Sequence, residues 1–149
     1  MKLVAYARLL GLSVADAGAA AVQMARNYGL SDPESWGVVG EAIVTGDRVP
    51  EAIALLDRAE ELPPRRQFLF RPALGQVDET IAYLQEMQRS GAGDLWRIGV
   101  FPEWDPLRED PRFIEIVNSL GVPNGYDRVA KRPNWPDAAD EAAGRRMGG

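Results

Sequence analysis

Cysteine and histidine are both absent from this sequence of 149 residues. Without cysteine the chain forms no disulfide, and without either residue it lacks the usual protein ligands of zinc. Imidazole, the commonest proton-transfer group near neutral pH, is missing as well. The sequence also contains no glycine-rich phosphate-binding stretch of the P-loop or dinucleotide type. We therefore expect no enzymatic activity, no metal site and no cofactor.

A long apolar run is also missing, since none approaches the ~20 residues that span a membrane. The formal net charge is −5, from 17 basic and 22 acidic residues. An acidic surface opposes the phosphate neutralisation on which non-specific nucleic-acid binding depends, and it mildly favours a basic or apolar partner. We expect a cytoplasmic protein that engages neither membrane nor nucleic acid, since the absence of cysteine is compatible with a reducing compartment.

The amino-terminal residues admit two interpretations. The stretch 1–7, followed by Ala15-Asp16-Ala17, has some features of a signal peptide with its cleavage site. Arg8 interrupts what would be the apolar core of such a peptide. This interruption favours the alternative, an amphipathic helix.

The most informative stretch runs from Pro33 to Pro64. Small and apolar residues at helical spacing mark one face on each of two helices: Trp36, Val39, Gly40 and Ile43 on the first, and Ala52, Leu56 and Ala59 on the second. Gly40 and Ala52 are small where the two helices would cross closely. Gly46-Asp47 forms the turn between the helices, and Pro63-Pro64 ends the second. A simple helical hairpin would have the same periodicity.

These positions also match the spacing W-x2-L-G-x2-Y…A-x3-F…P, so the stretch resembles a tetratricopeptide repeat. Gly18, Val22 and Ala25 stand 34 residues before Ala52, Leu56 and Ala59, at the period of that family. The resemblance implies an all-α array of helix pairs that packs through Trp36, Gly40, Ile43, Ala52, Leu56 and Ala59. It also implies a partner-binding concave surface formed by the first helix of each pair, here Glu34, Gly37, Glu41, Val44 and Thr45.

The remaining pattern completes an all-α prediction. Ser13 and Asp32 are expected to cap the helices that follow them, with Pro33 at a first helical position. Pro72 would interrupt a helix through 65–74, which should be short. The expected helices cover 2–10, 14–28, 33–45, 49–61, part of 65–74, 76–89, a short stretch within 95–101, and 111–120.

A second motif lies between Trp104 and Phe113. Asp105-Pro106 and Asp110-Pro111 each combine a capping residue with a proline suited to the first helical position. Arg108 and Arg112, one helical turn apart, either clamp an external anion or pair with Asp105, Glu109 or Asp110. The segment resembles a closing motif, roughly F-D-P-L-R-x-D-P-R-F, that follows the last repeat in some bacterial tetratricopeptide proteins. The matching residues are Trp104 (in place of Phe), Asp105, Pro106, Leu107, Arg108, Asp110, Pro111, Arg112 and Phe113.

We expect one helical repeat domain over 1–121, closed by the second motif, and a disordered tail over 122–149. The tail contains several prolines and no sustained apolar face. Tyr126 and Trp135 are either a short docking motif or isolated aromatics. If the tail is disordered, removing 123–149 should leave the stability almost unchanged, whereas removing 94–149 should unfold the chain.

In the family the repeats are often joined to a nucleotide cyclase, a protein kinase or a winged-helix activator domain. The resemblance therefore implies an interaction scaffold or regulatory module of a bacterial signalling or transcription regulator. Its partner would be a protein, a peptide or an upstream effector domain. The alternative is a non-catalytic C-terminal fragment of a cyclase- or kinase-type signalling enzyme.

Overall fold

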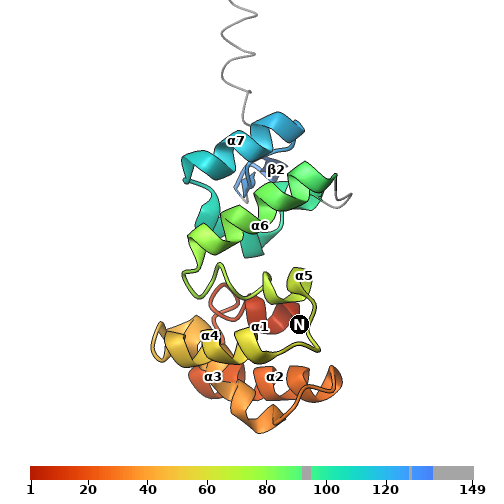
Figure 1. Ribbon diagram of the computed structural model, residues 1–149. Coiled ribbons are helices and arrows are strands. Elements are labelled where there is room, and N and C mark those ends of the chain that lie inside the picture. The colour runs from red at the N-terminus through yellow and green to blue at the C-terminus, as the bar shows by residue number, and fades with distance from the viewer. Residues whose placement is uncertain (92–94, 128, 136–149) are drawn as a thin grey trace, which may run out of the picture. The chain divides into compact units, whose positions relative to one another are not determined.

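The computed structural model describes residues 1–91, 95–127 and 129–135 (Figure 1). The chain divides into two compact units, unit 1 from Met1 to Gln76 and unit 2 from Val77 to Gly149. Nearly all regular structure in both units is helical, with one small two-stranded sheet. The all-α prediction is thus confirmed at the level of the fold class.

Unit 1 is built from short helices that follow the expected order. Its elements are α1 (Lys2–Ala5), α2 (Val14–Asn27), the 3-10 helix η1 (Pro33–Trp36), α3 (Gly37–Thr45), α4 (Val49–Arg58) and α5 (Pro64–Gln67). The helix expected over 2–10 ends at Ala5 and continues as turns. The segment 65–74 contains only a short helix, as Pro72 led us to expect.

Two expected helix caps have different outcomes. The Ser13 hydroxyl accepts a hydrogen bond of 3.0 Å from the backbone N–H of Asp16, which caps α2. The prediction for Asp32 is wrong, because its side chain makes no capping hydrogen bond and its φ of 49° is left-handed. An N-cap residue normally has extended backbone angles, so the carboxylate of Asp32 is not used by the helix.

The core of unit 1 is centred on the crossing of α2 and α3, which lie side by side (Figure 1). At Gly40 the backbones of the two helices approach so closely that an added Cβ would lie 2.0 Å from the carbonyl oxygen of Ala17. All six residues expected to pack the repeat are buried: Trp36, Gly40, Ile43, Ala52, Leu56 and Ala59. Trp36 retains only 2% exposure. The closest approach at Gly40, however, is to α2 and not to α4 as the sequence suggested.

Arg71 joins α4 to the turns that end unit 1. Its side chain is 9% exposed and donates hydrogen bonds of 2.9 Å to the Asp57 carboxylate and 2.7 Å to the Gln67 side chain. A third bond, of 2.6 Å, reaches the side chain of Gln76. A buried guanidinium needs several acceptors to offset its lost hydration. These three residues supply them to the two terminal nitrogens, whereas Nε is buried with no hydrogen-bond partner among the described residues.

Unit 2 contains two longer helices and a small hairpin. Its elements are α6 (Val77–Ser90), the 3-10 helices η2 (Leu95–Gly99) and η3 (Pro102–Leu107), α7 (Pro111–Leu120), β1 (Tyr126–Asp127) and β2 (Arg132–Pro133). The strands pair antiparallel, with Tyr126 opposite Pro133 and Asp127 opposite Arg132. Fully buried apolar side chains from the helices form its core: Ile81, Leu84, Ile98, Leu107, Phe113 and Val117.

This organisation differs from the expected domain boundaries. The single domain expected over 1–121 is divided after Gln76. The tail expected to be disordered over 122–149 contains the hairpin of β1 and β2, while residues 136–149 of that tail lie outside the described residues. In the part of the chain that the structure describes, no helix is long and apolar enough to cross a membrane.

Candidate functional site

Arg108, from the motif between Trp104 and Phe113, lies at the centre of unit 2. Its side chain is 13% exposed and donates hydrogen bonds of 2.6 Å to the carbonyl of Ile98 and 2.9 Å to the carbonyl of Phe101. It also pairs with the Asp105 carboxylate at 3.2 Å. Burial lowers the pKa of the Arg108 guanidinium, and the hydrogen bond from Asp105 opposes that shift. With three acceptors inside the fold, this side chain is not placed to clamp an external anion.

Arg112 is also engaged within unit 2. Its guanidinium contacts the Asp110 carboxylate at 2.8 Å and the Asp78 carboxylate, at the start of α6, at 2.7 Å. Asp110 in addition caps α7, accepting a 2.9 Å hydrogen bond from the backbone N–H of Arg112. The side-chain hydrogen bond from Arg112 holds the pKa of Asp110 at about 2, below its ordinary value of 3.8, and the pKa of Arg112 is raised. The sequence left two roles open for these arginines, clamping an external anion or pairing within the fold. In the structure they pair within the fold, Arg108 with Asp105 and Arg112 with Asp110.

The other members of the motif are structural too. Trp104, Leu107 and Phe113 are buried, with Phe113 fully so. Pro111 occupies the start of α7, and Pro106 lies within η3. The motif is therefore a packing and capping element of unit 2.

The segment after α7 is attached to this element by its backbone. The N–H of Gly125 donates a 2.6 Å hydrogen bond to the carbonyl of Gly99, and the side-chain amide of Asn124 donates one of 3.0 Å to the carbonyl of Arg108. An added Cβ on Gly99 would lie 2.8 Å from the carbonyl oxygen of Pro123. Residues 123–125 thus close the structure around Arg108.

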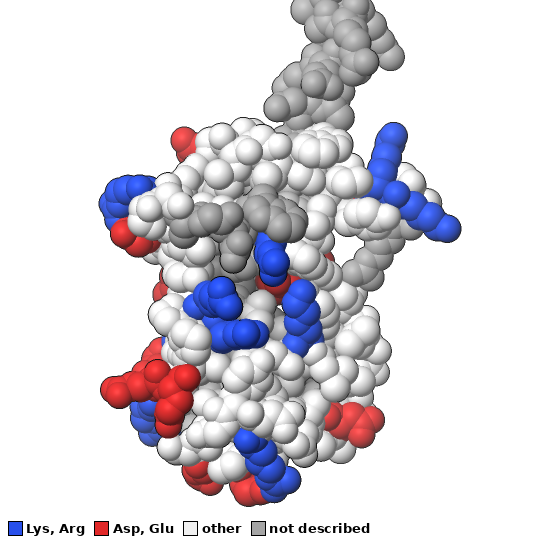
Figure 2. Space-filling model, turned by 90° about the vertical axis from the view of Figure 1, so that its right-hand side faces the viewer, with Lys and Arg blue, Asp and Glu red and all other residues white. Residues whose placement is uncertain are grey.

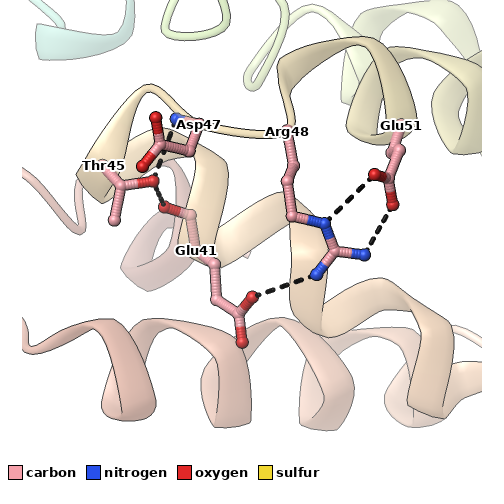
Figure 3. A network of polar contacts seen from close by, with 5 residues as sticks. All are labelled: Glu41, Thr45, Asp47, Arg48 and Glu51. Carbon is pink, nitrogen blue, oxygen red and sulfur yellow. Dashed lines mark hydrogen bonds and ion pairs between the residues drawn. The ribbon is translucent and has the colours of Figure 1, made fainter.

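The residues expected to line a concave groove lie on η1 and α3, but several are engaged inside unit 1. Glu41 pairs with Arg48 at 3.9 Å, and Arg48 also pairs with Glu51 at 2.5 Å (Figure 3). The Thr45 hydroxyl donates to the carbonyl of Glu41 and accepts from the backbone N–H of Asp47 (Figure 3). This polar network fixes the turn between α3 and α4.

The remaining expected groove residues do not gather around a common space. A Cβ on Gly37 would lie 3.6 Å from the Val22 side chain, so that position faces α2. Glu34 is exposed and forms an ion pair with Arg26. Val44 is half-buried against the core of unit 1. Glu41, whose side chain lies beside Gly18 of α2, is likewise directed at a neighbouring helix.

The structure does form a cleft elsewhere in unit 1. The connection from α2 to η1 and the end of α4 enclose an open volume of about 260 Å³. Its inner surface comes from the buried residues Leu30, Trp36 and Ala59. Its remaining lining residues are Leu55, which is half-buried, and the polar residues Ser31, Asp32, Ser35, Arg58 and Glu61. An apolar floor with a polar rim is the usual construction of a binding site.

Two charged groups at the rim of this cleft have no ionic partner. The Asp32 carboxylate and the Arg58 guanidinium are exposed, and neither forms a side-chain hydrogen bond or ion pair within the described residues. The third charge, on Glu61, accepts a 2.9 Å hydrogen bond from the Ser31 hydroxyl. The backbone N–H of Glu61 and this hydroxyl lower the pKa of the Glu61 carboxyl. The rim therefore carries two carboxylates and one guanidinium.

Sequence reasoning missed this cleft. Asp32 was predicted only as a helix cap. On the second helix of the repeat, the prediction covered the packing face and left out the neighbouring Leu55. The available signal was the pair Leu55 and Arg58, three residues apart on α4 and outside that packing face. In 1–91, 95–127 and 129–135 no three acidic side chains gather closely enough to hold a metal ion.

Comparison of the chain with protein-family models, with curated proteins and with solved structures finds no match.

Proposed function

We propose that this chain is a non-catalytic interaction module that binds a polypeptide segment in the cleft of unit 1. The observation that carries the proposal is the combination, in one open cleft, of an apolar floor with charged groups that have no partner of their own. A bound segment would cover the floor and supply those partners.

The shape of the cleft favours a short segment. Its volume of about 260 Å³ lies just below the usual range for ligand pockets, and it accommodates one or two side chains. Leu30 and Trp36 are buried in the core of unit 1, so the floor of the cleft is formed without a partner. Leu55 adds an apolar surface on α4 that a neighbouring side chain of the partner can cover.

The proposed module has a tetratricopeptide-like arrangement of helices. A tetratricopeptide-like arrangement is supported by the 34-residue spacing and by burial of the six packing residues from Trp36 to Ala59. On that basis we propose a place in a bacterial signalling or transcription regulator, with a protein, a peptide or an upstream effector domain as partner. The groove through Glu34, Gly37, Glu41, Val44 and Thr45 is not part of the proposal, since Gly37 and Glu41 face α2.

A nucleic-acid partner is disfavoured by charge. Figure 2 shows basic and acidic side chains in small groups, several of them adjoining, on a face that is mostly uncharged. Nucleic-acid binding depends on a continuous basic surface that neutralises successive phosphates, and a net charge of −5 works against it.

The test is an array of short immobilised peptides probed with the full chain and with cleft variants. Leu55→Gln removes apolar surface from the cleft, and Arg58→Glu reverses an exposed charge that no contact holds. Leu55→Gln should lose the peptides that the original chain binds, and Arg58→Glu should change which charged peptides are bound. Leu9→Gln is the matched control, because Leu9 is 46% exposed and lies outside the cleft. Binding that is equal in all four proteins, or absent from the original chain, would reject the proposal.

A further inference from the structure

The rim of the cleft carries more negative than positive charge. Asp32 and Glu61 contribute two carboxylates, against one guanidinium from Arg58. Ser31 links the carboxylates, because it precedes Asp32 in the chain and its hydroxyl donates to one oxygen of Glu61. The Asp32 carboxylate accepts no hydrogen bond within the described residues, so both of its oxygens are available as acceptors.

Arg58 does not neutralise this acidic pair. No ion pair forms between Arg58 and either carboxylate, although all three residues line the same cleft. The pKa of the Glu61 carboxyl, ordinarily well below neutral, is lowered further by its own backbone N–H and by the Ser31 hydroxyl. An ammonium or guanidinium group entering beside Ser31 would therefore meet two charged acceptors, the arrangement that gives the stronger class of hydrogen bonds.

Building on the proposed function, we propose that the partner segment presents one lysine or arginine side chain, held by Asp32 and Glu61, next to an apolar residue that packs on Leu55. The net charge of −5 also favours a basic partner at longer range. Arg58 supplies the repulsive element: it disfavours a second cation beside the first, so an isolated basic residue is preferred over a polybasic tract.

Three fluorescent peptides test this proposal, identical apolar sequences with a central lysine, glutamine or glutamate, titrated by fluorescence anisotropy. The lysine peptide should bind about tenfold more tightly than the glutamine peptide, as one charge-assisted contact implies. The glutamate peptide should bind most weakly. The preference should shrink as salt is added, because the contact lies at an exposed rim.

Asp32→Asn is the informative variant, since asparagine also tolerates the left-handed backbone of this position and no side-chain contact is lost. It should reduce the lysine-to-glutamine preference several-fold while leaving the glutamine peptide unchanged. Arg58→Gln should improve binding of a peptide with two adjacent lysines. Asp47→Asn, which removes the same charge outside the cleft, should change neither result.

The outcomes separate the two proposals. If the peptides bind equally well whatever their central residue, or if Asp32→Asn and Asp47→Asn behave alike, the basic-residue inference is overturned and the peptide-binding module stands. If none of the peptides binds and the array gives no cleft-dependent signal, both are overturned.

Discussion

Gly40 is the residue at which the packing of unit 1 is least tolerant. A Cβ there would lie 2.0 Å from the carbonyl oxygen of Ala17 and 2.5 Å from its carbonyl carbon. These are backbone atoms of a buried helix, so no flexible side chain can move aside to make room. Any residue other than glycine must therefore separate α2 from α3.

Gly40→Ala should lower the free energy of unfolding by about 3 kcal/mol, at the upper end of overpacking costs. Gly37→Ala is the control on the same helix, since its nearest neighbours would be at 3.6 and 3.7 Å, an ordinary contact. That variant should change stability by less than about 1 kcal/mol. Urea unfolding followed by circular dichroism measures both, and equal effects would contradict the close approach.

The comparison of Gly40 with Asp32 shows what residue patterns can and cannot predict. The repeat spacing indicated that Gly40 must be small, because a glycine at that place on an apolar helical face implies a close neighbour. It could not say that the neighbour is α2, since that depends on how three helices pack. For Asp32 the cap prediction used residue preference alone, and the left-handed φ of 49° could not be read from Asp-Pro. The cleft was not predicted either, because it also depends on how the helices pack against one another.

At the scale of elements, Arg108 joins two 3-10 helices that lack strong hydrogen bonding of their own. Its guanidinium reaches the carbonyl of Ile98 in η2 and that of Phe101 before η3. It also lies over the Phe113 ring of α7, 5.4 Å from the ring centre. The planar fork of arginine makes these contacts together, and a lysine ammonium cannot.

Arg108→Lys should therefore destabilise unit 2 by about 2–3 kcal/mol through the loss of a charge-assisted bond and an acceptor left unsatisfied. Arg132→Lys, at an exposed position of β2, is the control and should have almost no effect. Hydrogen exchange should show faster opening of α7 in the first variant only. Unchanged protection of α7 would mean that Arg108 does not hold these elements.

Asp110 connects the stability of unit 2 to pH. Its pKa is about 2 in the fold against an ordinary 3.8, so the ionised carboxylate stabilises the folded state above pH ~4. That contribution should be lost as the pH falls from ~4 towards ~2. Asp110→Asn keeps an N-cap acceptor but removes the charge. Thermal melts across this range should therefore show a shallower pH dependence for the variant, and parallel curves would contradict the role of the ion pair.

At the scale of the whole molecule, the two units have different degrees of predictability. Unit 1 followed its sequence pattern closely, because α2 and α4 are amphipathic and α3 is a short, mostly apolar helix that ends at Gly46. In unit 2 the helices α6 and α7 were equally predictable. The hairpin was not, since its strands have two residues each and the segment before them is held by one backbone bond to Gly99 and by the side chain of Asn124. Contacts of this kind leave no periodic signal.

Truncated chains test whether the residues after Val122 are dispensable, as the sequence predicted, or stabilise unit 2 through their contacts. Ending the chain after Val122 removes the bond from Gly125 to Gly99 and the bond from Asn124 to Arg108, so unit 2 should lose about 1–3 kcal/mol. Ending it after Trp135 keeps both. Hydrogen exchange at α7 reports the difference, and α2 provides the internal control. Identical protection in the two truncated chains would restore the view that nothing after Val122 supports the fold.

The tryptophans give this protein a built-in optical assay. Trp36 is 2% exposed and is the sole tryptophan of Met1–Gln76, while Trp104 is 9% exposed within unit 2. Replacing Trp96 and Trp135 with phenylalanine would leave one buried indole in each unit. Removing either remaining indole in turn would then assign the red shift on unfolding to a single unit. The order in which the two units melt, and whether a bound peptide protects only unit 1, would be readable from fluorescence without any attached label.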